Sequence, residues 1–324
     1  MAAAPHPDAV SRFRFDLEAV AGTGPAPLAV AVSGGPDSLA LLLLARAAWP
    51  ERVRAATVDH GLRPESPAEA EAVARLCGEL GVAHRILDVR VEVAGEGLQA
   101  AARAARYAAL AGWMEAEGLT LLLTAHHADD QAETLLMRLN RGSGVAGLAG
   151  VRAAGTVPGS GGRLRLLRPL LGWRRSELQA LLDAAGVEAA RDPSNSEERF
   201  DRVRFRLRLA EAPWLDPAAL ARSAALLAEA EAALEWTAAP LFAARAQVEE
   251  DIVTLRPHGL PPELLRRLVL RCLRRLAPGA KPRGEALAAF IARLDEGATA
   301  TLCGVMASGG ESWRFELAPP RRRT

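Results

Sequence analysis

The sequence predicts an α/β protein in which a parallel sheet, covered by helices, is followed by a smaller and mostly helical C-terminal domain. Short apolar runs alternate with helical stretches through the first half of the chain, which is typical of parallel strands joined by crossover helices. Polar segments follow three of these runs directly, at the position where open parallel sheets bind their ligands. The length of 324 residues fits about two domains.

Four apolar runs in the first half predict buried strands, and a stretch with helical character follows each of them. The expected strands cover Leu28–Val32, Val53–Val58, His84–Val91 and Leu119–Thr124, and the expected helices cover Pro36–Ala48, Pro67–Leu80, Leu98–Ala116 and Asp129–Leu139. The carboxyl ends of parallel strands meet at one edge of the sheet. We therefore expect the segments Ser33–Ser38, Asp59–Arg63 and Thr124–Glu133 to form one site.

The second half of the sequence begins with a glycine-rich loop and ends in a smaller domain. Glycines recur between residues 141 and 162, and a predicted helix at Leu178–Ala185 follows. We place a domain boundary at about Glu211–Pro217, where two prolines flank Trp214. This gives an N-terminal domain at residues 1–210 and a C-terminal domain at residues 211–324. The C-terminal domain has three predicted helices, at 217–238, 263–276 and 284–294, and two segments that can pair as strands, 299–305 and 312–317.

Composition narrows the class of protein. The 40 basic and 39 acidic residues leave a net charge of +1, which excludes a protein that binds nucleic acid through bulk charge alone. Only one basic residue is a lysine, Lys281, so a cation that contacts phosphate here is nearly always a planar guanidinium. The three cysteines, Cys77, Cys272 and Cys303, lie far apart, which argues against a disulfide framework and favours the reducing cytoplasm. No apolar run is long enough to predict a transmembrane helix, and the N-terminus does not resemble a secretory signal.

The strongest chemical signal is the hexapeptide SGGPDS at residues 33–38, which lies between a predicted strand and a predicted helix. Its two glycines allow a sharp turn and a close approach of a ligand, and its proline fits the first turn of a helix. Free backbone N–H groups and the positive end of the helix favour an anion there. The loop lacks the lysine of a Walker A motif and the spaced glycines of a dinucleotide fingerprint. The alternative is an ordinary strand–turn–helix with Asp37 and Ser38 near a cap.

This hexapeptide resembles the pyrophosphate loop of the PP-loop ATP pyrophosphatases, enzymes that adenylate a substrate and release pyrophosphate. Further segments resemble one family among them, the tRNA(Ile)-lysidine synthetases. They are VDHGLRPES (58–66), ARAARY (102–107), TAHHADDQAETLLMRLNRGSGVAGLAG (124–150), RPLL (168–171) and DPSNSEERFDRVRFR (192–206). The resemblance covers roughly residues 25–210, and the C-terminal third matches only loosely.

The resemblance implies a Rossmann-like PP-loop domain that binds ATP, followed by smaller tRNA-binding regions. It implies a ligase that uses ATP to activate C2 of the wobble cytidine in a tRNA(Ile) with a CAU anticodon, through an adenylated tRNA intermediate. Free L-lysine then displaces AMP and gives lysidine, which switches decoding from AUG to AUA. The implied cofactors are ATP and Mg²⁺, and the implied partners are this tRNA and lysine. A cytoplasmic location without membrane contact is expected.

The residues of the loop and its surroundings suit ATP. The loop supplies a cradle for phosphates, and Asp37 is the nearest carboxylate for a bound Mg²⁺. The alternative for Asp37 is an acid that the helix dipole favours. His60 is expected to contact the nucleotide, and the alternative is a turn histidine without a ligand. The expected ATP-binding residues are Ser33, Gly34, Gly35, Pro36, Asp37, Ser38 and His60.

Lysine has to be recognised as a cation and then deprotonated, and two neighbouring carboxylates suit both tasks. Asp130 and Glu133 lie three residues apart on one face of a predicted helix, although the same spacing resembles a capping box. Asp129 is an alternative to Asp130. His126 and His127 are expected to position phosphates or the cytidine, because adjacent histidines seldom bind one metal ion and no further His or Cys cluster accompanies them.

Arginines are the expected contacts with tRNA, whose unpaired loop bases are the usual target of such recognition. Arg206 matches the last arginine of the family's R-N-x-x-R pattern and is the expected active-site arginine, although Val203 replaces the asparagine. A solvated basic helix is the alternative for this stretch. The expected catalytic residues are thus Asp37, Asp130, Glu133 and Arg206, and the expected tRNA-binding residues are Arg103, Arg106, Arg141, Arg202, Arg204, Arg271, Arg274 and Arg275.

Three other functions fit parts of the sequence. A tRNA thiolase shares the same loop, but it needs cysteines or a cluster near the site, and the three cysteines lie in mid-helix or in the other domain. A non-catalytic protein that binds ATP and tRNA requires a decayed site, and the intact hexapeptide with Asp130 and Glu133 argues against decay. A general amide-forming synthetase is a further alternative, against which the arginine clusters favour RNA.

Overall fold

The computed structural model describes residues 2–24, 26–61, 65–91, 97–190 and 201–319. For Asp201 and Arg202 it describes the backbone but not the side chains. The chain divides into two compact units, Met1–Leu226 (unit 1) and Leu227–Thr324 (unit 2). The division falls within helix α9 (Pro217–Arg245), C-terminal to the boundary expected from the sequence. Each unit has its own hydrophobic core.

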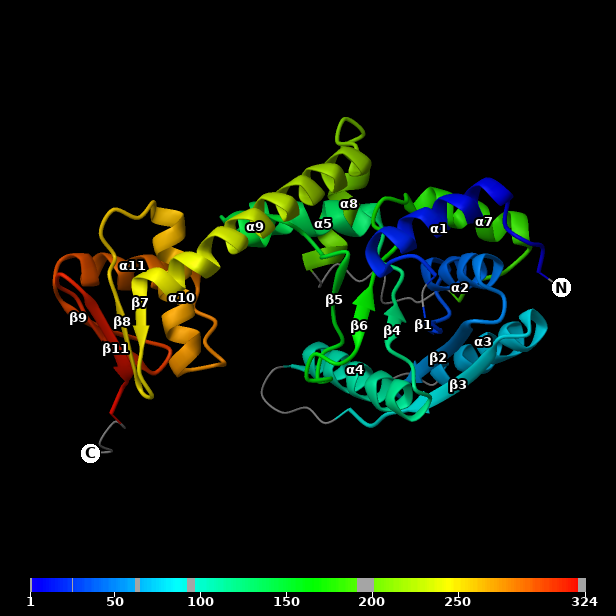
Figure 1. The fold of residues 1–324 in the computed structure, drawn as a ribbon. Coiled ribbons are helices and arrows are strands. Elements are labelled where there is room, and N and C mark those ends of the chain that lie inside the picture. Colours follow the sequence, from blue (N-terminus) through cyan, green and yellow to red (C-terminus); the bar gives the residue numbers. More distant parts are fainter. Residues whose placement is uncertain (1, 25, 62–64, 92–96, 191–200, 320–324) are drawn as a thin grey trace. The chain divides into compact units, whose positions relative to one another are not determined.

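Unit 1 is built around a six-stranded sheet with the strand order β3-β2-β1-β4-β6-β5 (Figure 1). Its strands are β1 (Leu28–Ala31), β2 (Val53–Asp59), β3 (Ala83–Asp88), β4 (Leu121–Leu123), β5 (Ala154–Thr156) and β6 (Arg165–Leu167). All neighbouring strands are parallel except β5, which pairs antiparallel with β6. Leu28 of β1 is in register with Val53 of β2 and Leu121 of β4, so these three central strands end at the same edge of the sheet.

Helices cover both faces of this sheet. One face carries the largest core of the chain, to which α1 (Pro7–Ala21), α2 (Pro36–Ala48), α3 (Ser66–Leu80) and α7 (Arg175–Ala185) contribute. The other face carries α4 (Leu98–Ala116), whose Leu110 and Met114 pack against Ala29 of β1 and Leu122 of β4. Figure 1 shows α1, α2 and α7 on one side of the strands and α4 on the other. The expected α/β fold with a largely parallel sheet is confirmed for this unit.

Helix α2 is apolar on nearly all sides because it lies between the sheet and two other helices. Every residue from Leu39 to Ala45 is buried, as a helix enclosed by neighbours requires. Gly35 occupies the N-cap position and Pro36 the first helical position, where proline needs no hydrogen-bond partner for its nitrogen. The predicted bounds of this helix and of α4 agree with the structure.

Several short or terminal elements of unit 1 lie outside the sequence prediction. Helix α1 begins at Pro7 after His6, whose Nδ1 accepts the backbone N–H of Asp8 at 3.3 Å, and it buries Phe13 and Leu17 one turn apart. Strands β5 and β6 have three residues each, too few for a readable alternation. Strand β5 lies within the predicted glycine-rich loop, and β6 lies just after it, where the sequence analysis predicts no strand. Helices α5 (Ala128–Leu139), α6 (Val145–Leu148) and α8 (Asp201–Ala210) complete the unit.

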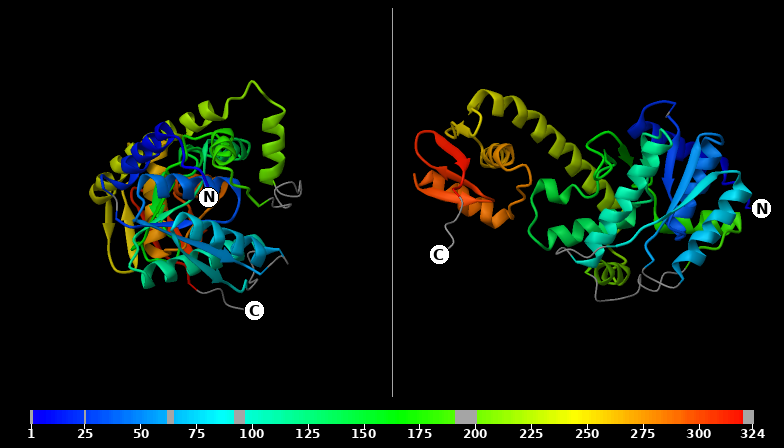
Figure 2. Two further views of the ribbon diagram at one scale, coloured as in Figure 1. Left: turned by 90° about the vertical axis from the view of Figure 1, so that its right-hand side faces the viewer. Right: turned by 90° about the horizontal axis from the view of Figure 1, so that it is seen from below.

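Unit 2 contains a five-stranded antiparallel sheet, so the expectation of a mostly helical C-terminal domain was wrong. The strand order is β7-β8-β11-β10-β9, with bounds Ala246–Val248, Ile252–Leu255, Trp313–Leu317, Val305–Ser308 and Thr299–Leu302. Val253, Ala307 and Phe315 belong to one core with residues of α10 (Pro262–Leu276) and α11 (Gly284–Asp295). These helices lie beside the strands of the sheet (Figure 2). Both predicted segments, 299–305 and 312–317, contribute strands to this sheet, but β9 and β11 do not pair with each other, because each pairs with β10. Strands β7 and β8 are not predicted from the sequence and have only three and four residues.

No helix in the part of the chain that the structure describes combines the length and apolar character needed to cross a membrane.

Candidate active site

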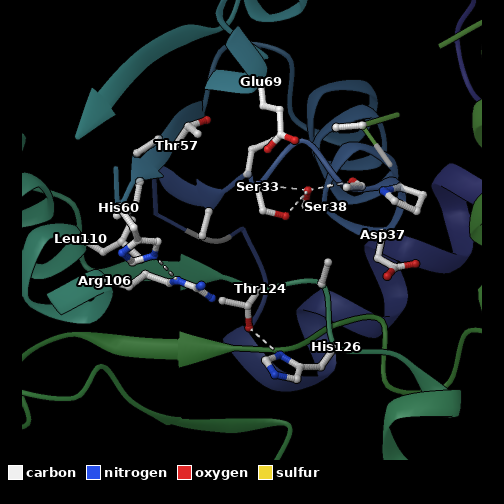
Figure 3. A pocket seen from close by; sticks show the side chains of 18 of the residues that line it. Ser33, Asp37, Ser38, Thr57, His60, Glu69, Arg106, Leu110, Thr124 and His126 are labelled. Atoms are coloured by element: carbon white, nitrogen blue, oxygen red, sulfur yellow. Dashed lines mark hydrogen bonds between the residues drawn. The ribbon is translucent and has the colours of Figure 1, made fainter. Parts of the chain in front are cut away.

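A cavity of about 540 Å³ lies at the carboxyl ends of β1, β2 and β4 (Figure 3). Its walls come from segments far apart in the sequence: the loop after β1, the end of β2, helices α3, α4 and α8, and the turn after β4. The structure therefore brings together residues from the three polar segments that the sequence places at strand ends. A parallel sheet makes this possible because its strands present their carboxyl ends on one side.

The loop after β1 is a tight turn held by Ser38. The Ser38 hydroxyl accepts the backbone N–H of Ser33 at 3.1 Å and donates to the carbonyl of Gly35 at 2.9 Å. It also lies 3.2 Å from the hydroxyl of Ser33. The turn directs the start of α2 at the cavity, where the helix dipole and the N–H groups of the first turn favour an anion.

Gly34 shapes this turn and does not line the cavity. Its φ of +80° lies in the left-handed region, which glycine adopts without a steric penalty. A Cβ atom here would lie in ordinary van der Waals contact, 3.5 Å from Val73 of α3 and 3.8 Å from Ala190. Its carbonyl accepts the backbone N–H of Ala190 at 3.0 Å. Of the six predicted loop residues, the other five line the cavity.

Asp37 lines the cavity with one oxygen free to bind a ligand. Its Oδ2 lies 3.4 Å from His127 Nε2. Its Oδ1 is buried and has no hydrogen-bond partner within the described residues. A buried acceptor without a donor is costly unless a ligand satisfies it, so this atom suits a cation bound with an anionic ligand.

His127 is the buried positive partner of several carboxylates. Its side chain is only 4% exposed, and Nδ1 lies 3.6 Å from Asp129 Oδ2 while Nε2 lies 3.6 Å from Asp130 Oδ2. Burial alone would lower the pKa of His127, but the contacts with Asp129 and Asp37 and the charge of Asp130 raise it to about 9. The expectation that this histidine has a positioning role stays a prediction.

The two expected lysine-binding carboxylates have different surroundings. Asp130 lines the cavity, and its Oδ2 accepts the backbone N–H of His127 at 3.0 Å, so it caps α5 from the third helical position. Glu133 is only 2% exposed and does not line the cavity. Its Oε1 accepts Arg206 Nε at 2.6 Å, and Arg206 itself lines the cavity. The capping interaction therefore joins Asp130 to His127 and does not join Asp130 to Glu133.

Asp129, the alternative to Asp130, is directed away from the cavity. Its Oδ2 accepts the backbone N–H of Arg175 at 2.8 Å and lies 3.4 Å from Arg174 Nε. Burial by itself would raise the pKa of Asp129, but His127, the Arg175 N–H group and the Arg174 charge hold it well below its usual range. This carboxylate therefore anchors the start of α5 to the start of α7.

Two arginines of helix α4 and His60 form another wall of the cavity. Arg103 and Arg106 both line the cavity, and Arg106 Nε donates to His60 Nε2 at 3.4 Å (Figure 3). Burial, followed by the charge of Arg106, lowers the pKa of His60. The Arg103 guanidinium lies 5.0 Å from the ring of Tyr107, which also lines the cavity. These positions place cations where a second anionic group can enter.

Among the other expected tRNA-binding arginines, those whose side chains the structure describes do not line this cavity. Arg141 and Arg204 of unit 1 are exposed, and the side chain of Arg202 lies outside the described residues. In unit 2, Arg271 donates to Glu235 at 2.7 Å. Arg274 and Arg275 are exposed at the end of the same helix, α10.

Some lining residues escape the sequence analysis. Glu69 of α3, Thr57 of β2 and Arg175 of α7 all face the cavity, and the first two are labelled in Figure 3. Thr57 carries a signal that could have been used, because it is a polar residue close to the carboxyl end of β2. No sequence feature marks Glu69 or Arg175 as a lining residue, because both look like ordinary residues in the first turn of a helix.

Comparison with known proteins gives the family. A family model described as a PP-loop domain matches residues 12–212. A tRNA(Ile)-lysidine synthase of Zymomonas mobilis is 46% identical over 315 residues, covering 96% of this chain and 95% of the relative. A tRNA(Ile)-lysidine synthase of Novosphingobium aromaticivorans is 50% identical over 316 residues, covering 97% of this chain and 95% of the relative.

A solved structure supports the fold alone. The U34-tRNA thiolase NcsA of Methanococcus maripaludis aligns with a TM-score of 0.56 at 16% identity, covering 68% of this chain and 79% of that one. The identity with the two synthases is much higher and extends through both units. The chain therefore belongs to the PP-loop proteins and, among them, to the tRNA(Ile)-lysidine synthase family.

Proposed function

We propose that this enzyme joins L-lysine to C2 of the wobble cytidine of tRNA(Ile) with a CAU anticodon. The cytidine 2-oxygen attacks the α-phosphorus of ATP and releases pyrophosphate, and the ε-amine of lysine then attacks C2 and releases AMP. One observation carries the proposal. The PP-loop, Asp130 and Arg206 line one cavity in a chain that is 46% to 50% identical to tRNA(Ile)-lysidine synthases over nearly its whole length.

The phosphates of ATP would lie at the start of α2. Backbone N–H groups of its first turn and the hydroxyls of Ser33 and Ser38 supply donors there. The adenine would lie against the ends of β1 and β2, where Val32 and Val58 line the cavity. This arrangement leaves the α4 wall, with its two arginines, for a different anionic group.

The surroundings of Asp37 fit a Mg²⁺ ion that accompanies ATP. The buried Oδ1 has no hydrogen-bond partner within the described residues, and carboxylate oxygens are preferred Mg²⁺ ligands. When bound, the ion offsets charge on the phosphates and on the departing pyrophosphate.

Asp130 is the group proposed to receive lysine. A carboxylate that lines the cavity attracts the ε-ammonium group and takes up a proton as the amine attacks. Arg206 is proposed to bind a phosphate of the nucleotide or of the adenylated cytidine, because its guanidinium reaches the same cavity. Glu133 then acts as a positioning residue that holds Arg206 through the bond of 2.6 Å.

The tRNA is proposed to meet both units. Arg103 and Arg106 suit a backbone phosphate beside the target cytidine, because they line the cavity from α4. Arg141, Arg202 and Arg204 are proposed contacts with the anticodon arm. Arg271, Arg274 and Arg275 of α10 are the proposed contacts of unit 2, which gives this unit a tRNA-binding role.

The direct test is the incorporation of labelled lysine into a CAU-anticodon tRNA(Ile) in the presence of ATP and Mg²⁺. We expect label in the wild-type enzyme and a loss of at least 100-fold in Asp37→Ala and in Asp130→Asn. Asp8→Ala is the matched control, because Asp8 is an exposed acid in the first turn of α1.

The other outcomes favour the alternatives. Pyrophosphate release with tRNA but without lysine incorporation would indicate a different nucleophile, as in a thiolase. Two of the three cysteines, Cys77 and Cys272, are fully buried, which does not favour that reaction. A folded protein that binds ATP and releases no pyrophosphate with tRNA would indicate a binding protein without catalysis.

A further inference from the structure

His127 lies behind the wall of the cavity. Its side chain is 4% exposed and does not line the cavity, whereas Asp37 and Asp130 do. Its Nε2 faces the Oδ2 atoms of these two residues at 3.4 Å and 3.6 Å. The imidazole therefore connects the PP-loop at the start of α2 with the start of α5.

The imidazole also faces a carboxylate on its far side. Its Nδ1 lies 3.6 Å from Asp129 Oδ2, which is fixed by the backbone N–H of Arg175 and by Arg174. The next backbone N–H, that of Ala128, donates to the carbonyl of Trp173 at 2.8 Å. The ring position is thus determined by α5 and by the segment that begins α7.

The two carboxylates depend on this ring to different degrees. Asp130 Oδ2 also accepts the backbone N–H of His127, a bond that does not require the imidazole. Asp37 has no such second contact among the described residues, because Oδ2 faces His127 and Oδ1 has no hydrogen-bond partner. The imidazole is therefore the contact that fixes the rotation of the Asp37 side chain.

We propose that His127 is a positioning residue that holds Asp37 Oδ2 and thereby presents Oδ1 to a divalent cation bound with the nucleotide. This inference rests on the proposed function for the role of the cation. It goes further by assigning the orientation of Asp37 to a residue outside the cavity. When a residue that orients a metal ligand is removed, metal affinity commonly falls 10- to 100-fold.

The test compares His127→Ala with His127→Gln, whose side-chain amide can donate to Asp37 Oδ2 as Nε2 does. Binding of Mn²⁺ to the ATP complex, followed by electron paramagnetic resonance, reports the cation without turnover. We expect His127→Ala to weaken Mn²⁺ binding at least tenfold and His127→Gln to recover most of that loss. Adenosine binding should stay within twofold, and the KM for lysine should change less than threefold, because Asp130 keeps its backbone bond.

The controls separate this role from a merely structural one. His6→Ala removes an exposed histidine and should leave Mn²⁺ binding unchanged. Unchanged Mn²⁺ binding in His127→Ala, or an equal loss of Mn²⁺ and adenosine binding in both His127 variants, would overturn the inference. A wild-type enzyme that binds ATP and Mn²⁺ but incorporates no lysine would count against the proposed function and leave the test of His127 intact.

Discussion

The charges around His127 favour a protonated ring. Burial by itself lowers the pKa of this histidine, and the neighbouring carboxylates outweigh burial and raise the pKa to about 9 from an ordinary value of 6.5. A pKa that is higher in the folded protein than in the unfolded chain means that protonation stabilises the fold. The contribution is fully present below about pH 6.5 and is lost as the pH rises through about 9.

The first prediction follows from this balance. Between pH 6.5 and pH 9.5, the free energy of unfolding of unit 1 should fall by roughly 3 kcal/mol more in the wild type than in His127→Gln, which has no titrating group there. Urea unfolding followed by circular dichroism at the two pH values measures this difference. The same pH dependence in both proteins would contradict the expected charge on the ring.

Sequence patterns find the residues around the cavity more readily than the role of each one. The helical period correctly indicates that residues 130 and 133 share a face of α5, but it does not show that Arg206 covers Glu133. The adjacent acids at 129 and 130 look equivalent in the sequence. They diverge because Arg174 and Arg175, brought close by the start of α7, bind one of them and leave the other on the cavity wall.

At the scale of elements, a continuous pattern matters more than length alone, because β4 has only three residues and is predicted from the apolar run that contains it. Helices α2 and α4 have 13 and 19 residues with continuous patterns, and their bounds are predicted correctly. Strands β5, β6 and β7 have three residues each, and only their partners in the sheet define them. The missed strands of unit 2 explain why that unit was expected to be mostly helical.

The glycine-rich segment after α5 is held by side chains of α5 itself. Arg138 donates to the carbonyls of Gly147 and Gly150, and Gln131 bonds both the N–H and the carbonyl of Val151. Gly150 has a φ of +61°, and a Cβ atom there would overlap Oε1 of Gln131. The segment therefore needs glycine at position 150 both for its backbone conformation and for close packing.

The second prediction is that Gly150→Ala destabilises unit 1 by about 2–3 kcal/mol, since it strains the backbone and displaces a buried amide with two hydrogen bonds. Thermal unfolding measures the change. Gly112→Ala is the matched control: Gly112 lies in the interior of α4 with open space around its Cβ position, so this change should stabilise the protein by up to about 1 kcal/mol. Equal effects of the two substitutions would contradict the packing argument.

At the scale of the whole molecule, the arginines of α10 divide into two groups. Arg267 is 5% exposed and pairs with Glu231 at 2.6 Å, Glu235 at 2.5 Å and Glu263 at 2.9 Å, so it joins α10 to α9 inside unit 2. Arg271 also pairs with Glu235. Arg274 and Arg275, in the last turn, are exposed. One helix thus supplies both internal ion pairs and the cations proposed to meet tRNA.

The third prediction tests that proposal. Replacing Arg271, Arg274 and Arg275 together by alanine should weaken tRNA binding and lower the slope of log K against log salt by about 0.7–0.9 for each phosphate that the variant no longer neutralises. The double variant that keeps Arg271 should show most of this effect, because Arg271 is already paired inside unit 2. Arg293→Ala, an exposed arginine of α11, is the control for removal of charge alone. Filter binding at several salt concentrations measures affinity and slope together. Unchanged affinity and slope in the triple variant would mean that unit 2 meets tRNA through another surface.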